Sequence, residues 1–548
     1  MGVAFVDLGA AMNQKLSHAG SAVAAPAAGP WSPLRNKVFR AIWLATLASN
    51  IGTWMHDVGA GWMMTSVSPS PLMVALVQAA TTLPMFLFAL PSGVLADIVD
   101  RRKYLLFAQA WMLVVAAALG LLALAGLVTP AVLLAATFLL GVGAAMNAPP
   151  FQAIVPDLVP KPELQSAVAL NSLGVNISRA IGPALGGVVL TLFGPPAVFL
   201  INAVSVLGVL WVIYRWQPAQ LARRLPPEHF FPAVRAGLRY VQAAPVLQVV
   251  LVRAVAFFVF GSAGWALLPL VARKGLAVGP GGYGLLLACV GAGAIGGALV
   301  LPRLRQLLSP DRLVLGASVI FALVLFAMSF FRSFALIAAV LLFAGLAWIV
   351  VLSVLNGGAQ RSSAGWVKAR ALAVYLVVFF GAMAAGSAVW GQIASLKGTD
   401  LALQVAGSGM LLAAVAALRW RLADSPDLDL TPSPHDAGAP LSEETTGDRG
   451  PVMITVEYHT DPGDAAAFRA AAREMRRVRR RGGALSWGLF EDMEAPGRYV
   501  ETFVIESWLE HLRQHERFSA NDKAIQARVH ALHRGPAPPR VRHLVSPP

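Results

Sequence analysis

The chain has 548 residues, of which 57% are apolar and 13% are charged. Soluble domains carry about 25% charged residues, so this composition excludes an ordinary water-soluble protein. The formal net charge of +15 would suit a nucleic-acid partner, but the basic residues stand mainly between and beside the apolar segments. Membrane topology explains that distribution, and we expect no nucleic-acid partner.

Residues 1–34 are rich in Ala, Gly and Pro, and Lys15 is their only basic residue. No cleavable apolar core follows it, so this stretch does not resemble a secretory signal. We expect a disordered tail, with Met12 as an alternative start, and the first membrane helix would itself direct insertion.

Long apolar runs fill the chain from residue 41 onward, and most of them reach the roughly 20 residues that span a bilayer. Lipid offers the backbone no hydrogen-bond partners, so each run must be helical. The sequence therefore predicts an all-α membrane protein with twelve transmembrane helices. The expected spans are 41–62, 72–95, 104–127, 131–150, 168–193, 197–216, 246–271, 283–302, 313–331, 334–355, 372–395 and 401–419.

The connections between these spans alternate in charge. One set carries most of the Lys and Arg residues, whereas the other is short and nearly uncharged, as in the GPP of 194–196. The positive-inside rule then places both termini in the cytoplasm, which an even number of spans also requires. The longest connection, 217–245, divides the chain into a first six-helix half, 35–216, and a second, 246–421.

After the last span the composition changes. Residues 422–450 are acidic and rich in Pro, which predicts a linker, and 451–548 alternate like a soluble, cytoplasmic α+β domain. The pattern predicts a strand, a helix, two strands, two helices and a closing strand. This order resembles the ferredoxin-like barrel of small antibiotic-biosynthesis monooxygenases, which generally work as dimers.

The role of this domain has two interpretations. We expect a regulatory or docking domain, through which the chain could self-associate; the alternative is a monooxygenase-like enzyme or a ligand sensor. His511 and His515 stand four apart on a predicted helix, which is more typical of a solvated face than of a metal site.

The connection after the second span reads GVLADIVDRRK and resembles the signature loop of the major facilitator superfamily, with aspartate at position 100 where that family usually has glycine. The resemblance implies a clasp, in which the helix packs closely at Gly93 and Asp97 pairs with cations and helix N-termini across the cytoplasmic face. The alternative is a basic loop that serves topology alone. The candidate gating residues are Gly93, Asp97, Asp100, Arg101 and Arg102.

The fifth span carries GPALGG, which resembles the antiporter motif of exporters in the same superfamily. At about 100° per residue, Gly182 and Gly186 fall on the same side of the helix as two polar residues, Asn171 and Arg179. We expect these two polar side chains to point into the bundle rather than toward lipid. Arg179 lies near the bilayer midplane, where a charge serves substrate binding or coupling, or else a structural ion pair or snorkelling. The alternative is that Gly and Pro simply make a packing face with a kink, which is compatible with a functional role. The candidates in this span are Asn171, Arg179, Gly182, Pro183, Gly186 and Gly187.

On the first span, Asn50, Trp54, Asp57 and Gly61 share one face at helical spacing. Asp57 is the only carboxylate well inside a span of the first half, which makes it the leading candidate for a titrating, proton-coupling group. The alternative is a hydrated carboxylate at the membrane interface. If Arg179 approaches Asp57 in one conformer and leaves it in the other, that contact would control proton uptake.

The stretches SNIGTWMHDVGAGWM and PSGVLADIVDRRK, together with the segment 147–187, resemble the bacterial major facilitator group that includes enterobactin exporters and macrolide efflux proteins. The resemblance implies a secondary transporter of the bacterial inner membrane that exports small organic molecules, such as siderophores or drugs, in exchange for protons. It implies neither an enzyme nor a cofactor. The single cysteine, Cys289, allows neither a disulfide nor a thiolate metal site, and span four lacks the Arg-x-x-Gln-Gly pattern of the usual proton-relay arginine.

Overall fold

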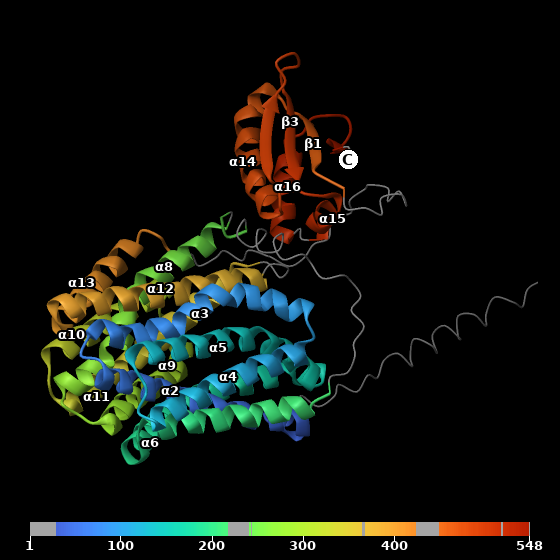
Figure 1. The fold of residues 1–548 in the computed structure, drawn as a ribbon. Coiled ribbons are helices and arrows are strands. Elements are labelled where there is room, and N and C mark those ends of the chain that lie inside the picture. Colours follow the sequence, from blue (N-terminus) through green and yellow to red (C-terminus); the bar gives the residue numbers. More distant parts are fainter. Residues whose placement is uncertain are drawn as a thin grey trace, which may run out of the picture.

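The computed structural model describes residues 29–217, 240–242, 244–363, 368–422, 449–516 and 519–546. Long helices pack side by side in one bundle, and a smaller domain built on a sheet lies outside it (Figure 1). Most of the predicted tail, central connection and linker falls outside the described residues. The bundle helices are α2 (Lys37–Val67), α3 (Pro71–Ile98), α4 (Arg101–Leu124), α5 (Pro130–Leu158), α6 (Leu164–Arg215), α8 (Pro245–Leu270), α9 (Pro280–Leu307), α10 (Pro310–Phe330), α11 (Phe334–Arg361), α12 (Lys368–Lys397) and α13 (Thr399–Ala417).

Within the described part of the chain, ten helices are long and apolar enough to cross a membrane. The number differs from the twelve predicted spans for two reasons. Helix α2 has 31 residues but is not among the ten, because Asn50, His56 and Asp57 lower its hydropathy. Helix α6 has 52 residues and is counted once, although Gly194 has φ 77° and breaks it in two. The break falls at the predicted GPP connection, where a glycine adopts a conformation that other residues rarely take and two prolines follow it.

Proline sets where many of these helices begin. Five of them start at a proline, namely α3, α5, α8, α9 and α10, because a proline in the first turn loses no intrahelical hydrogen bond and already has helical φ. The predicted spans begin up to three residues later, since hydropathy detects only the apolar part of a helix.

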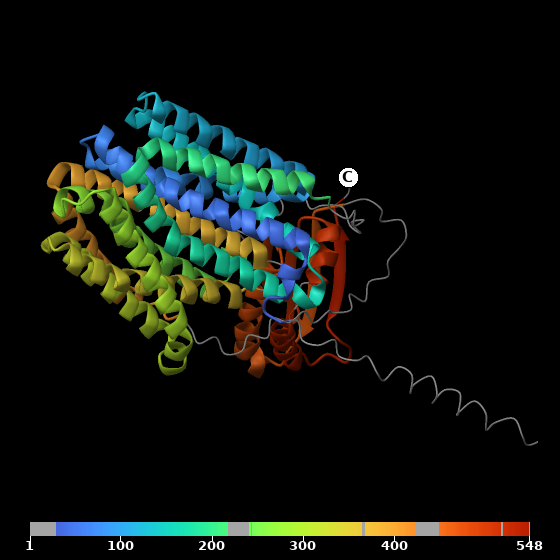
Figure 2. The same cartoon turned by 90° about the horizontal axis from the view of Figure 1, so that it is seen from below.

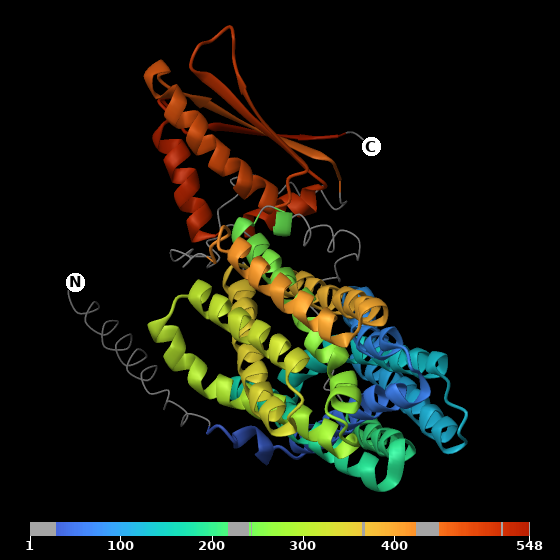
Figure 3. The same cartoon turned by 90° about the vertical axis from the view of Figure 1, so that its left-hand side faces the viewer.

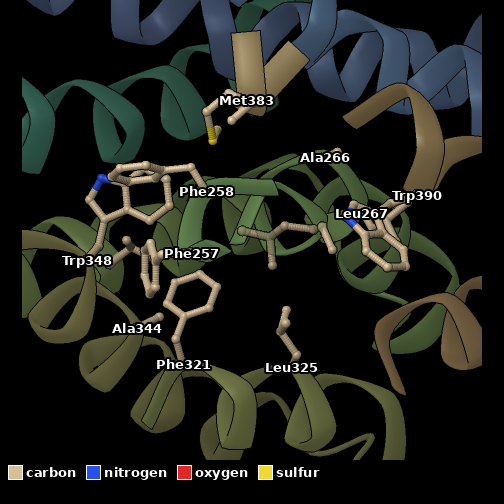
Figure 4. Packing of buried hydrophobic residues seen from close by; sticks show 14 of the residues in the cluster. Phe257, Phe258, Ala266, Leu267, Phe321, Leu325, Ala344, Trp348, Met383 and Trp390 are labelled. Carbon is tan, nitrogen blue, oxygen red and sulfur yellow. The ribbon is translucent and has the colours of Figure 1, made fainter. Parts of the chain in front are cut away.

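The bundle consists of N-terminal helices, α2 to α6, and C-terminal helices, α8 to α13, and in Figure 2 the orange α12 runs among the blue and teal N-terminal helices. The two sets of helices meet where α6 packs against α9 and where α3 packs against α12. Among the C-terminal helices the core is aromatic (Figure 4). Trp348 of α11 stands at its centre, with its ring centroid 5.2 Å from that of Phe258 and 5.9 Å from that of Phe321.

The smaller domain, called the sheet domain below, follows the predicted order of elements. Its strands form one antiparallel sheet in the order β2-β3-β1-β4, and α14 and α16 lie side by side against the sheet (Figure 3). The connectivity is strand, helix, two strands, two helices and strand. The elements are β1 (Val452–His459), α14 (Ala465–Arg481), β2 (Ser486–Glu491), β3 (Arg498–Ile505), α15 (Trp508–Glu516), α16 (Ala520–Ala531) and β4 (Arg540–Val545).

Side chains alternate along each strand between the two faces of the sheet, one of which is buried and the other exposed. Ile454 of β1 lies opposite Phe503 of β3, and both are buried beneath the helices. On the other face, Met453 and Leu544 are exposed. The prediction that His511 lies on a solvated helix face is wrong: its side chain is 3% exposed, because α15 turns this side toward the sheet. The side chain of His515 lies outside the described part.

Candidate transport site

Two ends of the bundle are distinguished below. The basic end is the one where α2 begins and α3 ends, and the far end is the one where α2 ends and α3 begins. The predicted gating loop lies at the basic end, between α3 and α4. Asp100 caps α4 there, because its carboxylate accepts a hydrogen bond of 3.0 Å from the backbone N–H of Lys103. The aspartate at this unusual position therefore starts the next helix.

The two arginines of this loop bind neighbouring helices. Arg101 donates to the carbonyl of Ala153, at 3.1 Å, and lies 3.6 Å from the carboxylate of Asp157 on α5. Arg102 donates to the carbonyls of Ile213 and Tyr214 in the last turn of α6. The last carbonyls of a helix carry partial negative charge, so a cation there ties α4 to the end of α6.

Close packing at Gly93 is a wrong prediction for this conformation. A Cβ placed on Gly93 would meet nothing within 4 Å. Instead, α3 approaches α12 closely nearer the far end, where a Cβ on Gly391 would stand 2.5 Å from that of Ala75. The side chain of Asp97 lies outside the described part of the structure, so its predicted pairing remains a prediction.

The glycines of the fifth predicted span face two different helices. A Cβ on Gly182 would lie 2.5 Å from the Cβ of Trp54, and one on Gly186 would lie 2.9 Å from the Cα of Met55, so both positions pack on α2. Gly187 instead faces the C-terminal helices, where its added Cβ would lie 3.0 Å from the Cα of Gly284 on α9. Small residues thus let α6 approach α2 and α9 at the same time.

Pro183 contributes to the same approach through its backbone. A Cβ on Gly284 would lie 2.6 Å from the Pro183 carbonyl oxygen and 2.7 Å from the Cα of Gly187. No side chain separates α6 from α9 at this point. The motif is therefore a packing face, and it packs between the N-terminal and the C-terminal helices.

Arg179 lies on the side of α6 that faces α2. Its guanidinium carbon stands 5.8 Å from the ring centroid of Trp54, within the range of a cation–π contact. The structure contains no ion pair of 4 Å or less between Arg179 and Asp57, both of which it describes. Asn50 and Asn171 are half-buried on α2 and α6.

Asp57 has a neighbour from the C-terminal helices that the sequence did not indicate. The hydroxyl of Tyr283 on α9 would be 3.1 Å from a Cβ on Gly61, which is one helical turn beyond Asp57 on the same face of α2. The Asp57 carboxylate also interacts electrostatically with Tyr283. His56 instead packs against Phe199 of α6, with ring centroids 4.8 Å apart.

At the far end, α2 is held to the C-terminal helices by a short π-helical turn, Val271–Gly275, that follows α8. Arg273 of this turn donates to the hydroxyls of Thr65, at 2.9 Å, and of Ser66. Its guanidinium carbon lies 5.5 Å from the ring centroid of Trp62. We call the contacts at Arg273, at Tyr283 and between Gly187 and Gly284 the far-end seam.

A buried arginine in α8 was missed at the level of sequence. Arg253 is 2% exposed and forms an ion pair with Asp311 of α10. It also donates to the carbonyl of Trp420, with a distance of 3.1 Å from Nε and 2.9 Å from one Nη, and Asp311 accepts from the N–H of Leu422. An arginine inside the apolar run VVLVRAVAFF was the signal, because such a charge requires a partner.

The chain matches known transporters in sequence and in fold. It is 25% identical over 290 residues to the staphyloferrin A transporter of Staphylococcus aureus, covering 51% of this chain and 70% of that protein. It is 28% identical over 285 residues to the enterobactin exporter of Citrobacter koseri, covering 51% and 67%. Among solved structures, a POT family transporter in complex with 5-aminolevulinic acid superimposes with a TM-score of 0.59 at 10% identity, covering 72% of this chain and 97% of that one.

A family model described as transmembrane secretion effector matches residues 28–547. The match includes the sheet domain as well as the bundle, and the likeness to the POT family transporter shows the fold of the bundle. The chain is therefore a multi-pass membrane protein that belongs to the transmembrane secretion effector family of major facilitator transporters.

Proposed function

We propose that this chain is a proton-coupled exporter in which two six-helix halves, 35–216 and 246–421, alternate access to a central site. The far-end seam carries the proposal. It joins the N-terminal to the C-terminal helices through backbone-to-backbone contact at Gly187 and Gly284 and through hydrogen bonds from Arg273. Contacts of this kind form or break as a unit when two packed bodies rock.

The direction of opening follows from the charges. The basic end is the cytoplasmic one under the positive-inside rule, which puts both termini in the cytoplasm and the far-end seam on the outer side. Cysteine substitutions at Lys103 and Lys397, in a background where Cys289 is serine, test this topology. Both side chains are exposed, and an impermeant maleimide applied to whole cells should label only the cysteine at 397. Labelling of both, or of the cysteine at 103 alone, would contradict it.

We propose that Asp57 binds and releases the coupled proton. We propose further that its contact with Tyr283 forms and breaks as the two halves rock. Arg179 and Asp57 belong to the same half, so rocking of the halves changes their separation little. Tyr283 belongs to the other half, and it lies over α2 in this structure, with its hydroxyl beside Gly61 and its ring stacked on that of Trp62. Rocking of the halves would carry it away from α2. Parting of the seam would leave the carboxylate facing the outer solution, where it can take up a proton.

The experiment is proton flux and substrate efflux in proteoliposomes, measured separately for Asp57→Asn, Tyr283→Phe and Arg179→Ala. Asp57→Asn should lose gradient-driven efflux and keep substrate exchange, and Tyr283→Phe should change the coupling ratio. Arg179→Ala should lower efflux without uncoupling it, because the Arg179 side chain lies on Trp54. Wild-type coupling in Asp57→Asn would remove Asp57 from the mechanism.

The substrate class that we propose is a siderophore or a chemically related small metabolite. This proposal is supported by the distant relationship of the chain to proteins that are named for staphyloferrin A and enterobactin. Cellular accumulation should be compared with and without the gene for these two siderophores and for a macrolide. Equal accumulation of all three would leave no support for the class.

We propose a ferredoxin-like fold for the sheet domain, and self-association through its exposed face. The strand order supports the first, and the exposed apolar side chains of Met453 and Leu544 on one face of the sheet support the second.

A further inference from the structure

The sheet domain contains a cavity of about 290 Å³ between the helix-facing side of the sheet and helices α15 and α16. Its floor is apolar and buried, formed by Ile454, Val456 and Phe503. Pro538 and Val541 also line it and are exposed. The cavity therefore opens to solvent beside strand β4.

The charged groups at the deep end of the cavity neutralise one another. Glu501, which is buried, accepts hydrogen bonds from Arg479 at 3.2 Å, from the Tyr458 hydroxyl at 3.2 Å and from the Trp487 indole at 2.9 Å. The Arg479 guanidinium also covers the ring of Phe503, at 4.4 Å. A charged ligand would therefore find no unpaired opposite charge here. Its transfer from water into the cavity would cost free energy that no contact compensates.

The remaining polar groups of the wall are imidazoles and amides. His511 and His543 lie with ring centroids 4.8 Å apart. Gln514 of α15 also lines the cavity, as do Gln526 and His530 of α16. Burial lowers the pKa of His543, so its ring is neutral at neutral pH. A neutral imidazole offers one donor and one acceptor, and the described residues contain no group of three side chains that could hold a metal ion.

We propose that this cavity binds a small, uncharged aromatic molecule that carries hydroxyl or carbonyl groups. The apolar floor and the aromatic ring of Phe503 suit a planar ring, and the imidazoles and amides suit oxygen atoms that both accept and donate. A cavity of about 150 Å³ accommodates one benzene ring, so about twice that volume suits two fused rings. This proposal is independent of the transport mechanism above.

The matched variants are Val541→Trp and Leu544→Trp. The two residues lie on the same strand and are 50% and 49% exposed, but only Val541 lines the cavity, because positions three apart face opposite sides of a strand. A tryptophan at 541 fills the mouth of the cavity, whereas one at 544 adds the same apolar area to the other face. A third variant, His543→Phe, keeps a ring and removes its hydrogen bonds.

Equilibrium dialysis of radiolabelled 2-naphthol against the full chain in nanodiscs is the test, with empty nanodiscs to subtract partition into lipid. We expect one saturable site per chain in the wild type and in Leu544→Trp, and none in Val541→Trp. His543→Phe should weaken 2-naphthol by about three- to ten-fold and leave unsubstituted naphthalene unchanged.

Three results would overturn the proposal. They are the absence of a saturable site in the wild type, an equal loss in both tryptophan variants, and tighter binding of naphthalene-2-sulfonate than of 2-naphthol. The last would show that the cavity selects an anion. Transport measured on the same preparations separates a failure of this site from a failure of the exporter.

Discussion

Substitution of Gly284 by alanine should open the far-end seam. The new Cβ would lie 2.6 Å from the Pro183 carbonyl oxygen, 2.7 Å from the Cα of Gly187 and 3.0 Å from its nitrogen. All three are backbone atoms, so no side chain can rotate away and α6 and α9 must move apart. Overpacking of this kind costs about 1–3 kcal/mol.

That cost falls only on the conformer in which the seam is closed. If the halves alternate as proposed, a penalty of about 1–3 kcal/mol changes the ratio of closed to open conformers by roughly 5- to 150-fold. Gly296→Ala is the matched control, because Gly296 lies on the same helix and its added Cβ would meet nothing within 4 Å. It should leave the ratio unchanged.

The assay is electron–electron distance measurement between spin labels across the seam. With Cys289 replaced by serine, labels at Leu192 and Lys397 report on the two halves, since both side chains are exposed at the far end. Gly284→Ala should shift the distribution to longer distances. An unchanged distribution, or the same shift in Gly296→Ala, would refute the reasoning.

Other contacts give three further expectations. Arg253→Ala leaves Asp311 without its cation, which should lower the free energy of unfolding by an amount near the lower end of about 3–5 kcal/mol, because Asp311 is partly exposed. Thermal unfolding of the detergent-solubilised chain measures this, and an unchanged midpoint would mean that water replaces the ion pair. The pKa of Glu457 is lowered, chiefly by a hydrogen bond from Arg498, so the stability it adds is present above the unfolded pKa and is lost as pH falls through the folded one. In Arg498→Ala, the protection of the β1 amides from hydrogen exchange should therefore fall less steeply toward acid pH than in the wild type. Parallel curves for the variant and the wild type would contradict this. Asp100→Ala removes a helix cap and should lower the free energy of unfolding by about 1 kcal/mol, whereas Asp100→Gly should lower it by only a few tenths. Equal losses in the two variants, measured by thermal unfolding, would rule out capping.

Membrane spans could be predicted because hydropathy and proline act locally. The break at Gly194 and the helices that begin at prolines follow from single residues and their backbone preferences. The order of strands and helices in the sheet domain followed likewise from alternation along the chain. The helix ends were less accurate. Most helices begin before the predicted span, since polar and charged residues extend a helix beyond its apolar part, whereas α4 and α13 end two or three residues before the predicted limit.

The candidate site could be predicted only in part, because contacts between distant helices leave no local pattern. Asp57 was found as a lone carboxylate, but the approach of Tyr283 depends on how α9 crosses α2. Gly93 fitted a motif whose expected packing is missing from this conformation. His511 looked solvated because a sequence does not show which side of α15 the sheet covers.

The Arg253 site also fixes the point from which the sheet domain is tethered. Leu422 is bound to Asp311, and the domain resumes where the Arg449 carbonyl accepts from the N–H of Trp508, at 2.7 Å. The 26 residues from 423 to 448 can span at most about 90 Å when fully extended. A covalent connection of at most this length keeps the sheet domain in the neighbourhood of the basic end and raises its local concentration there. Contacts too weak to detect between separate molecules would then be occupied for much of the time within one chain, so a modest change of affinity on ligand binding would suffice to release or engage them.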